Sequence, residues 1–116
     1  MIRRKDERPV NVFENRYGGA GAVKMTAIMN GQEELGGKGR LFSQITLAPG
    51  CGIGVHTHEN EWEAFYILSG QAELTDNGEV HTLSPGDMHL CHAGHSHGVH
   101  NAGTEDVEMV ALILYA

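Results

Sequence analysis

The sequence predicts an all-β fold of the barrel or sandwich type. Three observations support this prediction: short strand-like segments recur at regular spacing, turn-forming residues separate them, and no segment has a convincing helical periodicity. The chain has 116 residues, of which 41% are hydrophobic, so it can bury one core but not two. We therefore expect a single domain that spans residues 1–116.

Ten strands are expected in order along the chain. Turn residues such as Pro49-Gly50 and Pro85-Gly86 mark strand ends, and Asn77-Gly78 predicts a tight hairpin because this pair can adopt the positive φ angles of a type I′ turn. Residues 36–39 and 18–21 are glycine-rich and predicted to be loops, and the second lacks the pattern of a phosphate-binding loop. The predicted strands are 10–13, 22–29, 40–47, 53–58, 62–69, 71–75, 79–83, 87–92, 97–101 and 107–114.

Two of these strands are apolar on both faces. Residues 65–68 and 109–114 show no alternation of polar and apolar side chains, although a strand with one face in water should alternate. We infer that their outer face is covered, either by an N-terminal strand or by a second subunit.

Two short patterns between residues 50 and 101 supply three histidines and a carboxylate. In a strand, His56 and His58 would share one face, with Cα atoms about 6.5–7 Å apart. After a turn at residues 59–61, we expect Glu63 on the neighbouring strand, about 5 Å away, and His97 on a more distant one. An isolated H-x-H pair more often lies on a surface, but the matched spacing of both patterns favours a metal site. The first pattern is Gly50, His56, His58, Glu63 and Gly70, and the second is Gly86, Gly94, His97 and Asn101.

These patterns resemble the two motifs of the cupin superfamily, G-x5-H-x-H-x4-E-x6-G and G-x5-P-x-G-x2-H-x3-N. Nine of the ten fixed positions match, and His92 stands where the family usually has proline. The resemblance implies a single-domain cupin β-barrel, a double-stranded β-helix of jelly-roll type. Residues 40–115 would form the conserved barrel and residues 1–38 the N-terminal strands and loops. Small single-domain cupins commonly dimerise sheet to sheet, so we expect a homodimer.

The four expected ligands, His56, His58, Glu63 and His97, suit one divalent transition metal ion: Mn, Fe, Co, Ni, Cu or Zn. A six-coordinate ion would keep two positions open for water or substrate. The alternative is a cupin barrel that has these side chains but holds no metal.

Charge is distributed unevenly along the chain. All eight Lys and Arg residues lie in residues 1–40 with five acids, giving +3, whereas residues 41–116 carry ten acids and no base, giving −10. Nucleic acid is therefore an unsuitable partner. A clamp for a phosphorylated or carboxylated substrate would come from Lys24, Lys38, Arg40 or the metal. Arg40 is the best of these candidates because its strand leads into the first motif. Alternatively, Arg40 is a solvated charge at a strand end with no role in the site.

Other side chains near the motifs are weaker candidates. Glu61 shares strand parity with Glu63, so it is a candidate second carboxylate or general base at the pocket mouth. His95 lies in the turn before His97, either lining the pocket as an acid/base group or exposed to solvent. His100 has opposite parity to His97 and should point away from the metal. Asn101 is expected to hold backbone rather than metal.

Cysteine usage and the N-terminus suggest a cytoplasmic protein. Cys51 and Cys91 are too few for a disulfide framework and are expected to be reduced thiols, although a redox or substrate-binding role for Cys91 stays open. No apolar run approaches the ~20 residues that span a bilayer, and no apolar stretch follows the basic residues of 1–8.

The resemblance does not select one activity, because cupins include dioxygenases, decarboxylases, sugar isomerases and epimerases, and non-catalytic binding domains. Two hypotheses follow. The chain is a small enzyme acting on a compact polar, carboxylate or sugar substrate chelated to the metal, or it is a non-catalytic module that binds a small acid or sugar as a sensor. A structural, seed-storage-like role is disfavoured because such relatives usually have degraded ligands.

Overall fold

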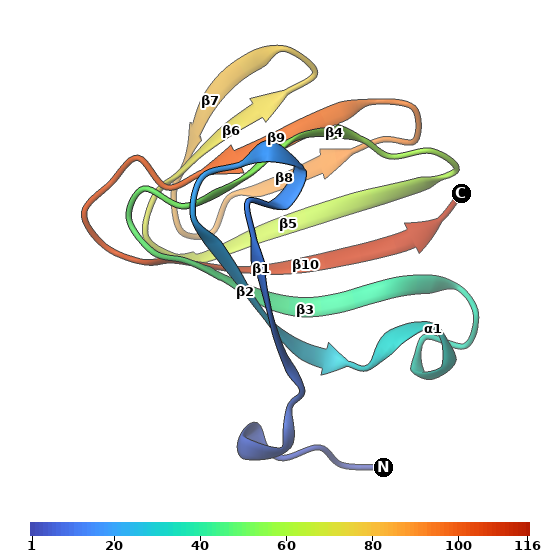
Figure 1. Ribbon diagram of the computed structural model, residues 1–116. Coiled ribbons are helices and arrows are strands. Elements are labelled where there is room, and N and C mark those ends of the chain that lie inside the picture. Colours follow the sequence, from blue (N-terminus) through green and yellow to red (C-terminus); the bar gives the residue numbers. More distant parts are fainter.

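The computed structural model describes residues 1–116 as two antiparallel sheets that face each other (Figure 1). One sheet has six strands in the order β1-β2-β3-β10-β5-β8, and the other has four in the order β4-β9-β6-β7. No helix is long and apolar enough to cross a membrane. The strands are β1 Val10–Glu14, β2 Ala22–Met29, β3 Gly39–Leu47, β4 Gly52–Thr57, β5 Glu61–Ser69, β6 Ala72–Asp76, β7 Glu79–Leu83, β8 Met88–Cys91, β9 Ser96–His100 and β10 Val107–Tyr115.

All ten predicted strands are confirmed, and no strand end shifts by more than one residue. The prediction that no segment is helical was wrong for three short segments. These are the helical turn α1 at Gly31–Glu34 and the 3-10 turns at Lys5–Glu7 and Arg16–Gly18. Each has only three or four residues, too few to produce a periodic pattern in the sequence. The hairpin at Asn77-Gly78 is confirmed, since both residues have positive φ, 48° and 95°, between β6 and β7.

From β4 onward the chain passes repeatedly between the two sheets, and only β6 and β7 are consecutive strands that pair with each other. This is the jelly-roll arrangement that the sequence predicted. Twelve buried apolar side chains fill the space between the sheets: Val23, Ile45, Leu47, Ile53, Phe65, Ile67, Ala72, Leu74, Val99, Val107, Met109 and Ala111. The ring of His97 from the second motif stacks on that of the core residue Phe65, with centroids 4.9 Å apart.

The doubly apolar strands alternate in burial although they do not alternate in polarity. On β10, Met109, Ala111 and Ile113 are buried, whereas Val110, Leu112 and Leu114, which alternate with them, are partly exposed. On β5, Tyr66 and Leu68 are 48% and 46% exposed on the outer face. The N-terminal strand β1 pairs with β2 and forms the edge of the large sheet, so it extends the sheet and leaves these side chains uncovered. Of the two alternatives, covering of this outer face by an N-terminal strand was therefore wrong. Covering by a second subunit, and with it the homodimer, stays a prediction.

Asn101, directly after β9, holds backbone as predicted. Its side chain is 1% exposed, and its Nδ2 donates to the carbonyl oxygens of Leu47 at 2.9 Å and Glu105 at 2.7 Å. Its Oδ1 accepts from the backbone N–H of Gly103 at 3.0 Å. One amide thus joins the end of β3 to the loop between β9 and β10.

We expect Asn101→Ala to lower the free energy of unfolding by about 2–3 kcal/mol, because buried carbonyl groups would lose their donors. Urea unfolding followed by circular dichroism measures this change. The matched control is Asn11→Ala on the exposed edge strand β1. This substitution should change the free energy of unfolding by no more than about 0.5 kcal/mol. Equal effects of the two substitutions would contradict the anchoring role.

Candidate metal centre

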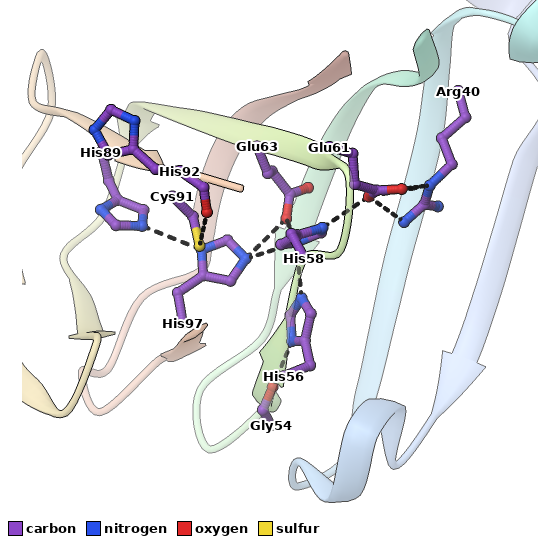
Figure 2. Close-up of polar contacts among 10 residues, drawn as sticks. All are labelled: Arg40, Gly54, His56, His58, Glu61, Glu63, His89, Cys91, His92 and His97. Atoms are coloured by element: carbon purple, nitrogen blue, oxygen red, sulfur yellow. Dashed lines mark hydrogen bonds and ion pairs between the residues drawn. The ribbon is translucent and has the colours of Figure 1, made fainter. Parts of the chain in front are cut away.

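Four buried or half-buried donor atoms converge on one point between the sheets (Figure 2). They are the Nε2 atoms of His56, His58 and His97 and the Oε1 atom of Glu63. His58 Nε2 lies 3.1 Å from His56 Nε2, 3.0 Å from His97 Nε2 and 3.0 Å from Glu63 Oε1. His97 Nε2 lies 3.0 Å from the same carboxylate oxygen. The structure thus brings together all four side chains that the sequence selected.

The strands that deliver these side chains differ from the expectation. His97 does not come from a distant strand, because β4 and β9 are neighbours and His56 pairs directly with His97 in their register. Glu63 does not come from the neighbour of β4, since β5 belongs to the opposite sheet. The turn after His58 crosses from one sheet to the other instead of forming a hairpin. The cluster therefore joins the two sheets: three histidines come from one side and the carboxylate from the other.

The spacing of the donors fits a six-coordinate ion. For metal–ligand bonds of about 2.1 Å, adjacent octahedral ligands lie about 3.0 Å apart, whereas tetrahedral ligands lie about 3.4 Å apart. The observed separations of 3.0 and 3.1 Å match the octahedral value. The cluster is able to hold a metal ion, and four ligands would leave two octahedral positions free.

Each imidazole has a partner on its other ring nitrogen, which fixes the orientation of the ring. His56 Nδ1–H donates to the carbonyl oxygen of Gly54 at 2.8 Å. His58 Nδ1 lies 2.7 Å from Glu61 Oε2, and His97 Nδ1 lies 3.1 Å from His89 Nε2 (Figure 2). A metal-binding histidine needs such an outer partner to present the other nitrogen unprotonated.

Glu61 lies between His58 and Arg40. Its carboxylate accepts three hydrogen bonds from Arg40, at 2.9 and 3.2 Å from Nε and at 2.8 Å from Nη2. The hydrogen bond from Arg40 holds the pKa of Glu61 below its ordinary value. Arg40, the preferred clamp in the sequence, thus reaches the site but is already paired with a carboxylate. Glu61 is placed to orient His58.

The buried charges depend on each other. Burial alone would raise the pKa of Glu63, but hydrogen bonds from His58 and His97 outweigh it and lower the pKa to about 2. Burial alone would lower the pKa of His58, but its hydrogen bonds with Glu63 and Glu61 raise the pKa above its ordinary value. Burial lowers the pKa of His56. The contact between His58 and Glu63 thus favours the charged form of each side chain.

The remaining sequence candidates lie outside the cluster. His95 is exposed in the turn between β8 and β9, with its ring against that of His92. His100 lines a different cavity, with Gly52 and Glu73, on the other side of the small sheet. Cys51 and Cys91 are free thiols, and Cys91 is fully buried, which raises its pKa to about 11.

A second group, His89, Cys91 and His97, also has its donor atoms within 4.8 Å of one another. It shares His97 with the first group but presents the opposite ring nitrogen, Nδ1, to His89. The raised pKa of Cys91 disfavours the thiolate that a metal needs. His89 therefore fits best as the outer partner of His97. The sequence did not predict this contact, because β8 and β9 belong to different sheets and strand parity does not show which residues meet between sheets.

Two residues at the site, Arg16 and Tyr17, were not predicted from the sequence. They line a cavity of about 20 Å³ together with His56, His58 and Glu63. The Tyr17 ring stacks on the His56 ring, with centroids 4.2 Å apart and planes inclined by 13°. Both residues belong to the turn between β1 and β2, which Figure 1 shows reaching the strand β4 of the other sheet. No local pattern marks such a long-range contact.

The family model described as the cupin domain matches residues 43–113. The chain belongs to the cupin family. A cupin relative from Thermotoga maritima, an oxalate-binding protein, is 36% identical over 114 residues, which are 98% of this chain and 93% of the relative.

Solved cupin structures agree with this fold. The crystal structure of a predicted oxalate decarboxylase from Thermotoga maritima superimposes with a TM-score of 0.94 at 35% identity over 100% of both chains. A cupin domain of an XRE family transcriptional regulator from Enterobacter cloacae gives a TM-score of 0.67 at 27% identity, covering 81% of this chain and 95% of that domain.

Acid should destabilise the metal-free cupin through Glu63. Because its folded pKa, about 2, lies below the ordinary 4.5, ionised Glu63 stabilises the fold above pH 4.5, and this contribution is lost as pH falls through about 2. We expect the free energy of unfolding in the presence of a chelator to fall more steeply in the wild type than in Glu63→Gln. Urea titrations at about pH 5 and about pH 3 measure the two slopes. Parallel slopes would show that Glu63 is not the titrating group.

Proposed function

We propose that this cupin binds a small carboxylate through a divalent transition metal held by His56, His58, Glu63 and His97. The observation that carries the proposal is the convergence of these four donors at the spacing of adjacent octahedral ligands. Three imidazoles and one carboxylate suit Mn, Fe, Co, Ni, Cu or Zn. Two free adjacent positions on the ion suit a ligand with two oxygen donors.

The charge of the site supports an anionic ligand. Three neutral imidazoles and one carboxylate leave about +1 on a divalent ion. Arg16 adds a second positive charge to the cavity wall, while Arg40 is balanced by Glu61. The oxalate-binding relative, which matches nearly the whole chain, supports a carboxylate over a neutral sugar.

Binding without catalysis is the better supported of the two hypotheses. The only carboxylate or histidine side chains that line the cavity are His56, His58 and Glu63, which are proposed metal ligands. Glu61 does not line it and is engaged by Arg40 and His58, and His95 is exposed elsewhere. The two candidate acid/base groups are therefore badly placed for proton transfer to a ligand. The resemblance to a cupin domain of a transcriptional regulator supports the same reading.

Catalysis is the second candidate function. It is supported by the likeness to a predicted oxalate decarboxylase across the whole chain. A bound ion would then supply Lewis-acid polarisation or O₂ activation. Glu61 would orient His58, and Glu61→Gln would alter turnover while sparing metal content.

The first test is metal content. We expect the purified cupin to carry one ion per chain and the double variant His58→Ala/His97→Ala to carry almost none, since two of the four ligands are removed. Elemental analysis measures both. The matched control, His81→Ala/His92→Ala, removes two histidines outside the cluster and should keep the metal. Equal metal in all three proteins would refute the assignment.

The second test is ligand-induced stabilisation. A carboxylate at ten times its Kd should stabilise metal-loaded protein by about 1.4 kcal/mol, which raises Tm by roughly 5–10 °C for a domain of this size. A thermal-shift screen of small carboxylates, keto acids and sugars against metal-loaded and metal-stripped protein measures this. Stabilisation that is the same with and without metal would exclude chelation and favour a metal-independent binding module.

A further inference from the structure

Arg16 is a cation without a partner at the wall of the metal cavity. Its guanidinium makes no hydrogen bond or ion pair within the chain, and its Nε is buried without any acceptor. Buried polar atoms are almost always satisfied in folded proteins, so an orphan donor beside a cavity marks a place for an acceptor that the chain does not provide.

Aromatic packing holds Arg16 in this position. Its Cζ lies 4.1 Å from the centroid of the Phe13 ring and 5.1 Å from that of Tyr17. Tyr17 is in turn stacked on His56, and the backbone of this turn lies against Gly54, where an added Cβ would overlap the Tyr17 carbonyl oxygen. Contacts on both sides thus fix the guanidinium while leaving its donors free.

Arg16 also lines two neighbouring cavities. The inner cavity, about 20 Å³, touches His56, His58 and Glu63, and an outer one, about 170 Å³, opens beside β1, β2 and β3. Both cavities are lined by Arg16 and Arg40. Because Arg40 is bound to Glu61, Arg16 is the cation available to a ligand that enters from the outer cavity.

We propose that Arg16 recognises the second negative charge of a small dicarboxylate whose other oxygens reach the metal. This proposal rests on the proposed function and names the ligand class that the site selects. A divalent ion with Glu63 leaves about +1, and Arg16 adds +1, so a dianion balances the site whereas a monocarboxylate leaves one charge unmatched. The inner cavity has room for little more than one water, so a short dianion fits better than a long one.

Isothermal titration of manganese-loaded protein with oxalate and with acetate tests the proposal. Arg16→Gln should weaken oxalate binding about 10–100-fold, the loss expected for a charge-assisted hydrogen bond, and weaken acetate binding by less than about threefold. Elemental analysis should find the same metal content as in the wild type, because Arg16 is not in the donor cluster. Lys24→Gln, which removes one charge from the exposed face of β2, should leave both affinities unchanged.

Arg16→Lys provides a second measurement if Arg16→Gln does not fold. It keeps the charge but not the planar donor fork, so it should retain part of the preference for oxalate over acetate. An unchanged oxalate affinity in Arg16→Gln, an equal loss for both acids, or an equal loss in Lys24→Gln would overturn the role of Arg16 and leave metal-dependent carboxylate binding intact. If manganese-loaded wild type binds neither acid, the proposed function itself fails, and the role of Arg16 fails with it.

Discussion

The organisation of this protein depends on the burial of four potential metal-ligand atoms between two sheets, all within 4.8 Å of one another. Such donors repel each other unless a proton or a metal ion lies among them. The lowered pKa of Glu63 and the raised pKa of His58 follow from the hydrogen bond between these two side chains. The fold of the two sheets provides the stability that keeps the donors together.

The surroundings of the donors are arranged in chains of hydrogen bonds. Arg40 holds Glu61, and Glu61 holds His58, while His89 holds His97. These outer groups come from strands of the large sheet, whereas the three histidine ligands come from the small sheet or from the turn that follows β4. The relative placement of the two sheets therefore sets the orientation of the His58 and His97 rings, whereas the His56 ring is held by Gly54 of its own strand.

The cations beside the donor cluster come from a different part of the chain than the four donors. The family model covers residues 43–113, which contain the four donors, whereas Arg16, Tyr17 and Arg40 precede it. The basic N-terminal third thus brings cations to a site whose own sequence region carries ten acids and no base. Under the proposed function, a turn outside the region that the family model matches would supply the ligand preference of the site.

The sequence by itself determined the ten strands, the hairpin at Asn77-Gly78, the backbone role of Asn101 and the four donors, because turn chemistry, strand alternation and motif spacing are local properties. The predicted strand positions of Glu63 and His97 were wrong, because the spacing of residues along the chain does not determine whether a turn forms a hairpin or crosses to the opposite sheet. Only the tertiary structure decided that Arg40 is neutralised by Glu61, that His89 supports His97, and that Arg16 lies beside the donors. These contacts join residues that lie 8 to about 40 positions apart in the sequence. The identity of a side chain does not determine which distant residue will pack against it.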